Sequence, residues 1–378
     1  MTVKNLPIRF FEARKRDEQL TEAGGNSDLP KWVLKGNELS ARSRHLSAEM
    51  NSVSALFEVW KSKDLKLPMV IATTISEYAI AKSHRGLIVN MLNSDGNLNV
   101  IGVDSGRNGG RRILSVVTTD ELIGNVRKTL EDVVNSARLI SSLEDLEPFE
   151  PFSEGYNLQN HMYRVRLIDY KNSEINMLAR NLFKNMCSAM GITIEKEMQY
   201  STEMYLYRIV LDTKEKLEML LGFEGIYSVK EVSFIEIETD SLDQGVCVPV
   251  KTPEAGKSYP VIGVLDSGIS RNNYLSPWLL SEKEVYYEEE FLNRHHGSMV
   301  ASVVEYSDEL NGTSYTATNG VLLLEAAVIP DTKKEKHVTT EDVLDNVEDA
   351  VGRHKDIKVW TMSVGTYLEC MEGELPLS

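Results

Sequence analysis

The alternation of hydrophobic and polar positions divides the chain into three parts. Before residue 67 the strongest pattern lies at 39–60, where hydrophobic residues recur with the spacing of one helix face. From 67 to 240, strand-like runs alternate with runs of helical period. Beyond 260 the order strand, turn, helix repeats, which favours a parallel α/β sheet. We therefore expect a helical N-terminal extension over 1–66, an α+β middle part and an α/β C-terminal part.

The first half of the middle part, 67–150, follows the order βαββαβ. This order predicts a ferredoxin-like unit, which we interpret as regulatory. The glycine-rich GRNGG at 106–110 predicts the hairpin loop between its central strands. In chain order the six runs are MVIATTIS (69–76), EYAIAKSHRGLIVNML (77–92), LNVIGVDS (98–105), RILSVVTT (112–119), DELIGNVRKTLEDVV (120–134) and a last strand near ARLISSL (137–143).

The second half, 158–240, repeats the same order and predicts a second ferredoxin-like unit. Ser173 and Gly191 are the predicted N-cap and C-cap of its long helix. Residues 241–258, rich in glycine, proline and polar residues, predict a linker. The six runs of the second unit are HMYRVRLIDY (161–170), SEINMLARNLFKNMCSAMG (173–191), ITIEKEMQY (192–200), EMYLYRIVLDT (203–213), KEKLEMLLGF (214–223) and YSVKEVSFIEIE (227–238).

Composition narrows the classes of function. The 378 residues are 42% hydrophobic, enough for folded cores, and carry a net charge of −16. Nucleic acids and anionic membranes would repel such a chain, so neither is an expected partner. No segment has the pattern of a secretion signal or a transmembrane helix, and the three cysteines, Cys187, Cys247 and Cys370, have no metal-binding or disulfide spacing. We expect a cytoplasmic protein.

Two short segments in the C-terminal part carry candidate chemistry. VIGVLD (261–266) predicts a buried parallel strand that ends in Asp266, at the sheet edge where such folds place their sites. RHHGSMVASVV (294–304) places His296 beside Gly297 at the start of a helix-like run. A histidine held there can act as a base, and a carboxylate on a neighbouring strand end can accept its Nδ1–H.

VIGVLDSGI followed by HGSMVAS resembles the aspartate and histidine motifs of the subtilisin-like serine proteases (subtilases, peptidase family S8). Three later segments match the family in order, and the resemblance covers about 260–368. It implies the first half of a subtilisin-like parallel-sheet protease domain, which we place at 259–378. The three segments are GVLLLEAAVIP (320–330), TTEDVLDNVEDAVGRH (339–354) and IKVWTMSVGT (357–366).

The resemblance also implies an activity, serine-type endopeptidase, with a polypeptide substrate. Asp266 would orient His296, and Ser363, Val364 and Gly365 would bind the substrate backbone. No cofactor is needed for this chemistry, and a bound structural calcium ion remains an alternative.

Many subtilases carry a propeptide of βαββαβ topology, so 158–240 is interpreted as propeptide-like and 239–260 as an autoprocessing site. Cytoplasmic relatives with long N-terminal extensions imply an AAA-type ATPase partner.

The resemblance implies a catalytic triad of aspartate, histidine and serine. The serine motif is missing from the segments that match. In the family it follows the histidine by about 150 residues, so we expect it beyond Ser378 and expect this chain to be an inactive N-terminal portion of a longer protease. Two alternatives stay open. One is an inactive pseudo-protease fragment that binds peptides or a partner, and the other is a regulator whose tandem ferredoxin-like units sense a small ligand.

Three further features have simpler interpretations. Ser314, in a Gly-Thr-Ser sequence, is expected in a surface loop. Asp104, in a near repeat of the Asp266 motif (VIGVDSG, 100–106), is expected to form a turn. The acidic run EKEVYYEEE (282–290) is expected to be a solvated loop, with calcium binding or selection of basic substrates as alternatives. His295 is expected to face solvent or to shape the cleft.

Overall fold

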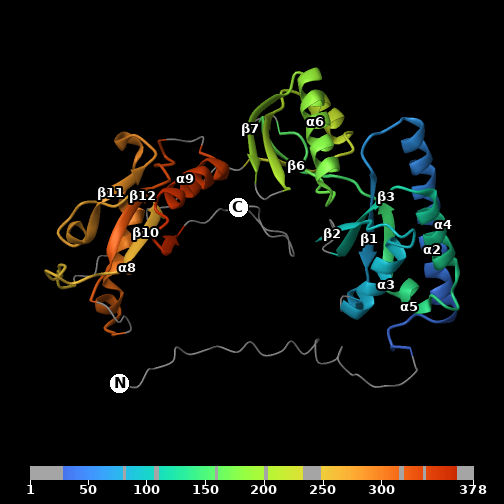
Figure 1. Ribbon diagram of the computed structural model, residues 1–378, viewed down its shortest axis with the longest axis horizontal. Coiled ribbons are helices and arrows are strands. Elements are labelled where there is room, and N and C mark those ends of the chain that lie inside the picture. The colour runs from blue at the N-terminus through green and yellow to red at the C-terminus, as the bar shows by residue number, and fades with distance from the viewer. Residues whose placement is uncertain are drawn as a thin grey trace. The chain divides into compact units, whose positions relative to one another are not determined.

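The computed structural model describes residues 29–79, 82–105, 110–157, 161–199, 203–232, 248–314, 319–334 and 338–363. The chain forms two compact units, the first ending at Glu231 and the second beginning at Val232 (Figure 1). Unit 1 contains two mainly antiparallel sheets, and unit 2 contains one parallel sheet. The fold is therefore mixed α/β, with the parallel sheet in the C-terminal part as expected.

The first sheet of unit 1 has the strand order β2-β3-β1-β4 and is covered on one face by helices. Leu46 and Met50 of the N-terminal helix pack there against strand and helix residues such as Ile71 and Val126. The predicted helix at 39–60 is confirmed as α2. The elements are α2 (Gly36–Ser62), β1 (Met69–Ile75), η1 (Glu77–Ala79), α3 (Lys82–Leu92), β2 (Val100–Ser105), β3 (Arg111–Val117), α4 (Asp120–Glu131), α5 (Ala137–Ser141) and β4 (Leu143–Pro148).

The position predicted for the last strand, near 137–143, is wrong. Residues 137–141 form the short helix α5, and the strand β4 begins only at Leu143. A short hydrophobic run does not distinguish strand from helix by its pattern. Of the predicted hairpin loop at 106–110, only Gly110 lies within the described residues, and β2 and β3 on either side pair in antiparallel register.

The second sheet has the order β5-β9-β6-β8-β7. The N-cap of its long helix is Asn172, whose side chain accepts the amides of Glu174 and Ile175, so the predicted cap Ser173 is wrong by one residue. The C-cap is Met190, and Gly191 follows it with φ +62°, a conformation that favours glycine. The elements are β5 (Phe152–Ser153), β6 (Met162–Leu167), α6 (Ser173–Ala189), β7 (Thr193–Gln199), β8 (Tyr205–Val210), α7 (Lys214–Leu221) and β9 (Ile226–Glu231).

The two sheets of unit 1 share a hydrophobic core and are also joined by a polar link. Asp104 lies on β2 rather than in a turn, which corrects the sequence-based expectation. Its carboxylate accepts two hydrogen bonds from Arg112 on β3, at 3.0 and 2.9 Å, and one from the Tyr227 hydroxyl on β9, at 3.2 Å. Burial raises the pKa of Tyr227 to about 12, so the hydroxyl keeps the proton that it donates.

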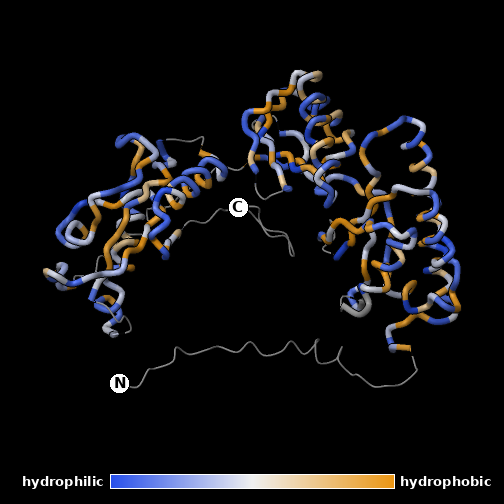
Figure 2. Tube along the Cα trace, viewed as in Figure 1, coloured by the Kyte–Doolittle hydropathy of each residue, from blue (hydrophilic) through white to orange (hydrophobic). Residues whose placement is uncertain are grey.

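The sheet of unit 2 has the order β11-β12-β10-β13, with all pairs parallel. Helix α8 packs on one face, where Val300 meets Val264, and α9 packs on the other, where Val343 joins the cluster of Leu265 (Figure 1). Hydrophobic residues gather on the central strands of this unit (Figure 2). The elements are β10 (Val261–Asp266), η2 (Ser276–Trp278), β11 (Leu279–Val285), η3 (Glu289–Phe291), α8 (His295–Asn311), β12 (Leu322–Ala327), α9 (Thr340–Arg353) and β13 (Val359–Met362).

Part of the acidic run at 282–290 is a strand, not a solvated loop. Residues 282–285 complete β11, which pairs with β12 through Lys283, Glu284 and Val285. This strand lies at the end of the strand order, so its outer side chains reach water and its charges are tolerated.

Lys251 helps to hold the described chain before β10 against α8. Lys251 donates from Nζ to the carbonyl oxygen of Glu305 at 2.6 Å and lies 3.0 Å from a carboxylate oxygen of Glu309. Its own carbonyl oxygen accepts the indole N–H of Trp278 at 3.0 Å. Residues 233–247, which include the first part of the predicted linker and autoprocessing site, lie outside the described residues.

In the part of the chain that the structure describes, no helix combines the length and the hydrophobicity that a membrane span needs.

Candidate active site

The structure brings Asp266 and His296 into direct contact. His296 Nδ1 lies 2.8 Å from one carboxylate oxygen of Asp266 and 3.0 Å from the other. The Asp266 side chain is 1% exposed, whereas that of His296 is 15% exposed. An ionised carboxylate only accepts hydrogen bonds, so Nδ1 carries the proton and Nε2 is the basic nitrogen of the neutral ring.

The buried carboxylate of Asp266 is stabilised by hydrogen bonds rather than by water. It accepts the amide of Ser267 at 2.7 Å in addition to the imidazole. The Asp266 carbonyl oxygen accepts the amides of Val328 and Ile329, at 2.9 and 3.3 Å. The side-chain carboxylate and the backbone carbonyl of Asp266 are thus both hydrogen-bonded, and a buried charge needs such partners.

Two glycines allow the strand end and the helix start to approach each other. Gly268 has φ +94°, a backbone conformation that residues with a Cβ rarely adopt. At Gly297 an added Cβ would lie 2.3 Å from the carbonyl oxygen of Gly268 and 3.2 Å from the Asp266 Cβ. Gly297 therefore sets how closely α8 approaches the loop after Asp266.

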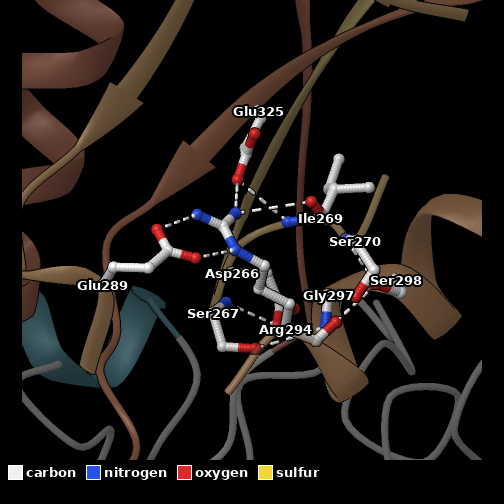
Figure 3. Close-up of polar contacts among 9 residues, drawn as sticks. All are labelled: Asp266, Ser267, Ile269, Ser270, Glu289, Arg294, Gly297, Ser298 and Glu325. Carbon is white, nitrogen blue, oxygen red and sulfur yellow. Dashed lines mark hydrogen bonds and ion pairs between the residues drawn. The ribbon is translucent and has the colours of Figure 1, made fainter. Parts of the chain in front are cut away.

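Serine hydroxyls join this loop to the first turn of α8 (Figure 3). The Ser267 hydroxyl accepts the Gly297 amide at 3.3 Å, and the Ser298 hydroxyl accepts the Ser270 amide at 2.8 Å. These bonds link the two segments that carry Asp266 and His296.

A partly buried ion pair lies beside the same loop, and the sequence analysis did not identify it. Arg294, the residue before α8, lies between Glu325 of β12 and Glu289 (Figure 3). The hydrogen bonds and positive charge of Arg294 lower the pKa of Glu289. The sequence did contain a signal for this pair, because Glu325 is the single charged residue in the otherwise hydrophobic run LLLEAAVI. A charge buried in a central strand needs a partner of opposite charge.

The other predicted site residues are placed only in part. β13 runs parallel to β10 with Leu265 paired to Met362, so Ser363 follows β13 at the sheet edge where β10 ends. Ser363 is exposed, and Val364 and Gly365 lie outside the described residues.

His295 and Ser314 are both exposed. Ser314 lies beyond the C-terminal end of α8, whose length separates it from His296 by roughly 20 Å.

Within the described ranges, no cluster of His, Cys, Asp and Glu side chains is arranged to hold a metal ion. The chemistry that the contact offers is proton transfer. Nε2 can take a proton, and the resulting imidazolium is stabilised by the carboxylate at Nδ1.

Comparison with known proteins agrees with this geometry. The model of the subtilase family (peptidase S8) matches residues 257–374, the stretch that contains both Asp266 and His296. No curated protein matches the chain. The match to the subtilase family thus covers residues 257–374, and it supports a subtilisin-like protease domain in this part of the chain.

Proposed function

We propose that the subtilase-family domain serves peptide-bond hydrolysis through an Asp-His-Ser triad, with His296 as the proton carrier and Asp266 as its orienter. The observation that carries the proposal is the 2.8 Å contact between Asp266 and His296 Nδ1 in a domain that matches the subtilase family. The serine nucleophile is not assigned to a residue of this chain.

In the proposed reaction His296 moves one proton in each half. Nε2 takes the proton of the serine hydroxyl while the oxygen attacks the scissile carbonyl carbon. The C–N bond then breaks, and the leaving amine receives that proton. A water molecule repeats the sequence on the acyl-enzyme and releases the acid. The ionised Asp266 stabilises the imidazolium in both halves.

Substrate binding by Ser363, Val364 and Gly365 is part of the proposal. Support comes from the place of Ser363, which follows a strand that runs parallel to β10 and ends at the same sheet edge. Extended peptides commonly bind by adding backbone hydrogen bonds to such a segment.

We also propose two ferredoxin-like modules, a regulatory one at 67–150 and a propeptide-like one at 158–240. Support comes from the strand orders, because β2-β3-β1-β4 and β7-β8-β6-β9 are the same arrangement of first, second, third and fourth strands. Autoprocessing at 239–260, a cytoplasmic location and an AAA-type ATPase partner also remain proposals.

The test uses a fluorophosphonate probe, which reacts with an activated serine, on the protein encoded by the reading frame that contains this chain. We expect labelling that His296→Ala abolishes and Asp266→Asn strongly reduces. His295→Ala is the matched control, because His295 is the exposed neighbour of His296. Absence of labelling in the unsubstituted protein, together with retained peptide binding, would favour the pseudo-protease alternative.

A further inference from the structure

The contact between Asp266 and His296 depends on two segments that are distant in sequence. Asp266 ends β10, and His296 lies in the first turn of α8. A hydrogen bond of 2.8 Å requires that the loop after Asp266 keep a fixed position against this turn.

Glu325 holds the loop from the side of the sheet. It lies on β12, opposite Val264 of β10, and is 2% exposed. Its Oε1 accepts the backbone amide of Ile269 at 3.1 Å. A carboxylate buried between hydrophobic residues persists only when its charge and lone pairs are satisfied.

Arg294 holds the same loop from the side of the helix. Its Nη1 bonds to Glu325 Oε1 and also donates to the Ile269 carbonyl oxygen at 3.3 Å. The ion pair therefore forms hydrogen bonds to both the N–H and the C=O of one residue, Ile269 (Figure 3). The other edge of the guanidinium is fixed by Glu289, at 3.0 and 2.9 Å.

The glycine of the loop fits this arrangement. A Cβ at Gly268 would lie 2.7 Å from Arg294 Nη1 and 3.2 Å from Glu325 Oε1. The ion pair thus packs directly over the backbone between Asp266 and Ile269.

We propose that Glu325 and Arg294 are positioning residues, which clamp the loop after Asp266 to the start of α8 and thereby set the hydrogen bond between Asp266 and His296. This inference rests on the proposed function, because the bond has a catalytic use only in a triad. A residue with a merely structural role would affect unit 2 as a whole without acting selectively on this bond.

The test is nuclear magnetic resonance of the full chain with 15N-labelled histidine. A ring proton shared with a carboxylate resonates far downfield and exchanges slowly with water. The signal of His296 among the seven histidines is assigned by its loss in His296→Gln.

Two variants weaken the clamp in different ways. Glu325→Gln keeps an oxygen for the Ile269 amide but removes the charge that holds Arg294. Arg294→Lys keeps a positive charge but removes the planar group that bonds to Glu289, Glu325 and Ile269 together. We expect exchange of the His296 ring proton to accelerate by about tenfold or more in each, a factor that corresponds to about 1.4 kcal/mol.

The matched control is Glu305→Gln. Glu305 is also a buried glutamate of unit 2, 3% exposed, which accepts a backbone amide (Val321, 2.8 Å) and pairs with a basic residue, Lys251. It lies on α8 beyond the first turn, so its replacement should leave the His296 signal unchanged.

Three results would overturn the inference. The first is an unaltered His296 signal in folded Glu325→Gln or Arg294→Lys protein, and the second is an equal change in Glu305→Gln. The third is that both clamp variants fail to fold, which would assign the pair to stability alone. If the unsubstituted protein lacks the signal, the proposed function fails as well, because its central hydrogen bond is then absent.

Discussion

Gly297→Ala is the smallest change that should separate Asp266 from His296. The added Cβ would lie 2.3 Å from the backbone carbonyl oxygen of Gly268, whereas ordinary contacts begin near 3.4 Å. Backbone cannot rotate away as a side chain can, so α8 must retreat by about 1 Å. That movement would stretch the 2.8 Å hydrogen bond between His296 and Asp266 beyond normal hydrogen-bond distance.

The energetic cost can be isolated by comparison with Gly352→Ala. Gly352 is in α9, and an added Cβ there would meet nothing within 4 Å. Both changes replace glycine by alanine in a helix, which favours the helix by up to about 1 kcal/mol. The difference between the two variants therefore reports the clash, for which overpacking data suggest about 1–3 kcal/mol.

The assay is hydrogen exchange of the full chain, followed by mass spectrometry on peptides of β12. Exchange of these central amides reports the free energy of opening of unit 2. A clash of about 2 kcal/mol corresponds to roughly 30-fold faster exchange in Gly297→Ala than in Gly352→Ala. Equal exchange in the two variants would refute the reasoning, because it would mean that α8 does not press on the loop after Asp266.

Three more predictions concern stability. Burial raises the pKa of Glu305 from 4.5 to about 7, so its proton stabilises the folded state fully below about pH 4.5, and this contribution is lost as the pH rises through 7. The free energy of unfolding, measured in urea, should fall by no more than about 2 kcal/mol over this pH window. Glu305→Gln should remove this contribution to the pH dependence. An unchanged pH profile in the variant would contradict the assignment. Tyr227→Phe removes the hydrogen bond to Asp104 and should lower the unfolding free energy of unit 1 by about 1 kcal/mol; the idea fails if a double-mutant cycle with Asp104→Asn shows no coupling. Thr339→Ala breaks the capping box of α9 and should cost about 1 kcal/mol in thermal unfolding, whereas Thr339→Ser should stay close to the unsubstituted protein; equal melting of both variants would argue against the cap.

Local patterns predicted the elements whose hydrophobic period is long and regular. The helices α2, α6 and α9 and the strands β10 and β12 lie within a few residues of their predicted ranges. The contact of Asp266 with His296 could also be anticipated, because a strand end and a helix start meet at the carboxyl edge of a parallel sheet.

The features that escaped prediction depend on partners far along the chain. Charges made β11 resemble a loop, and only its place at the edge beside β12 explains them. Asp104 resembled a turn residue because its partner Tyr227 lies on another sheet. No local pattern indicates that Arg294 meets Glu325, since the pair forms only when α8 packs on β12.

Lys251 has a mechanical consequence. Tension applied to the chain from its N-terminal side enters unit 2 along the segment before β10. The lysine anchors that chain to the backbone of Glu305 and, through Trp278, to the helical turn before β11. A pull on that segment therefore loads the far end of α8 first, and β10, which ends in Asp266, is sheltered from the force.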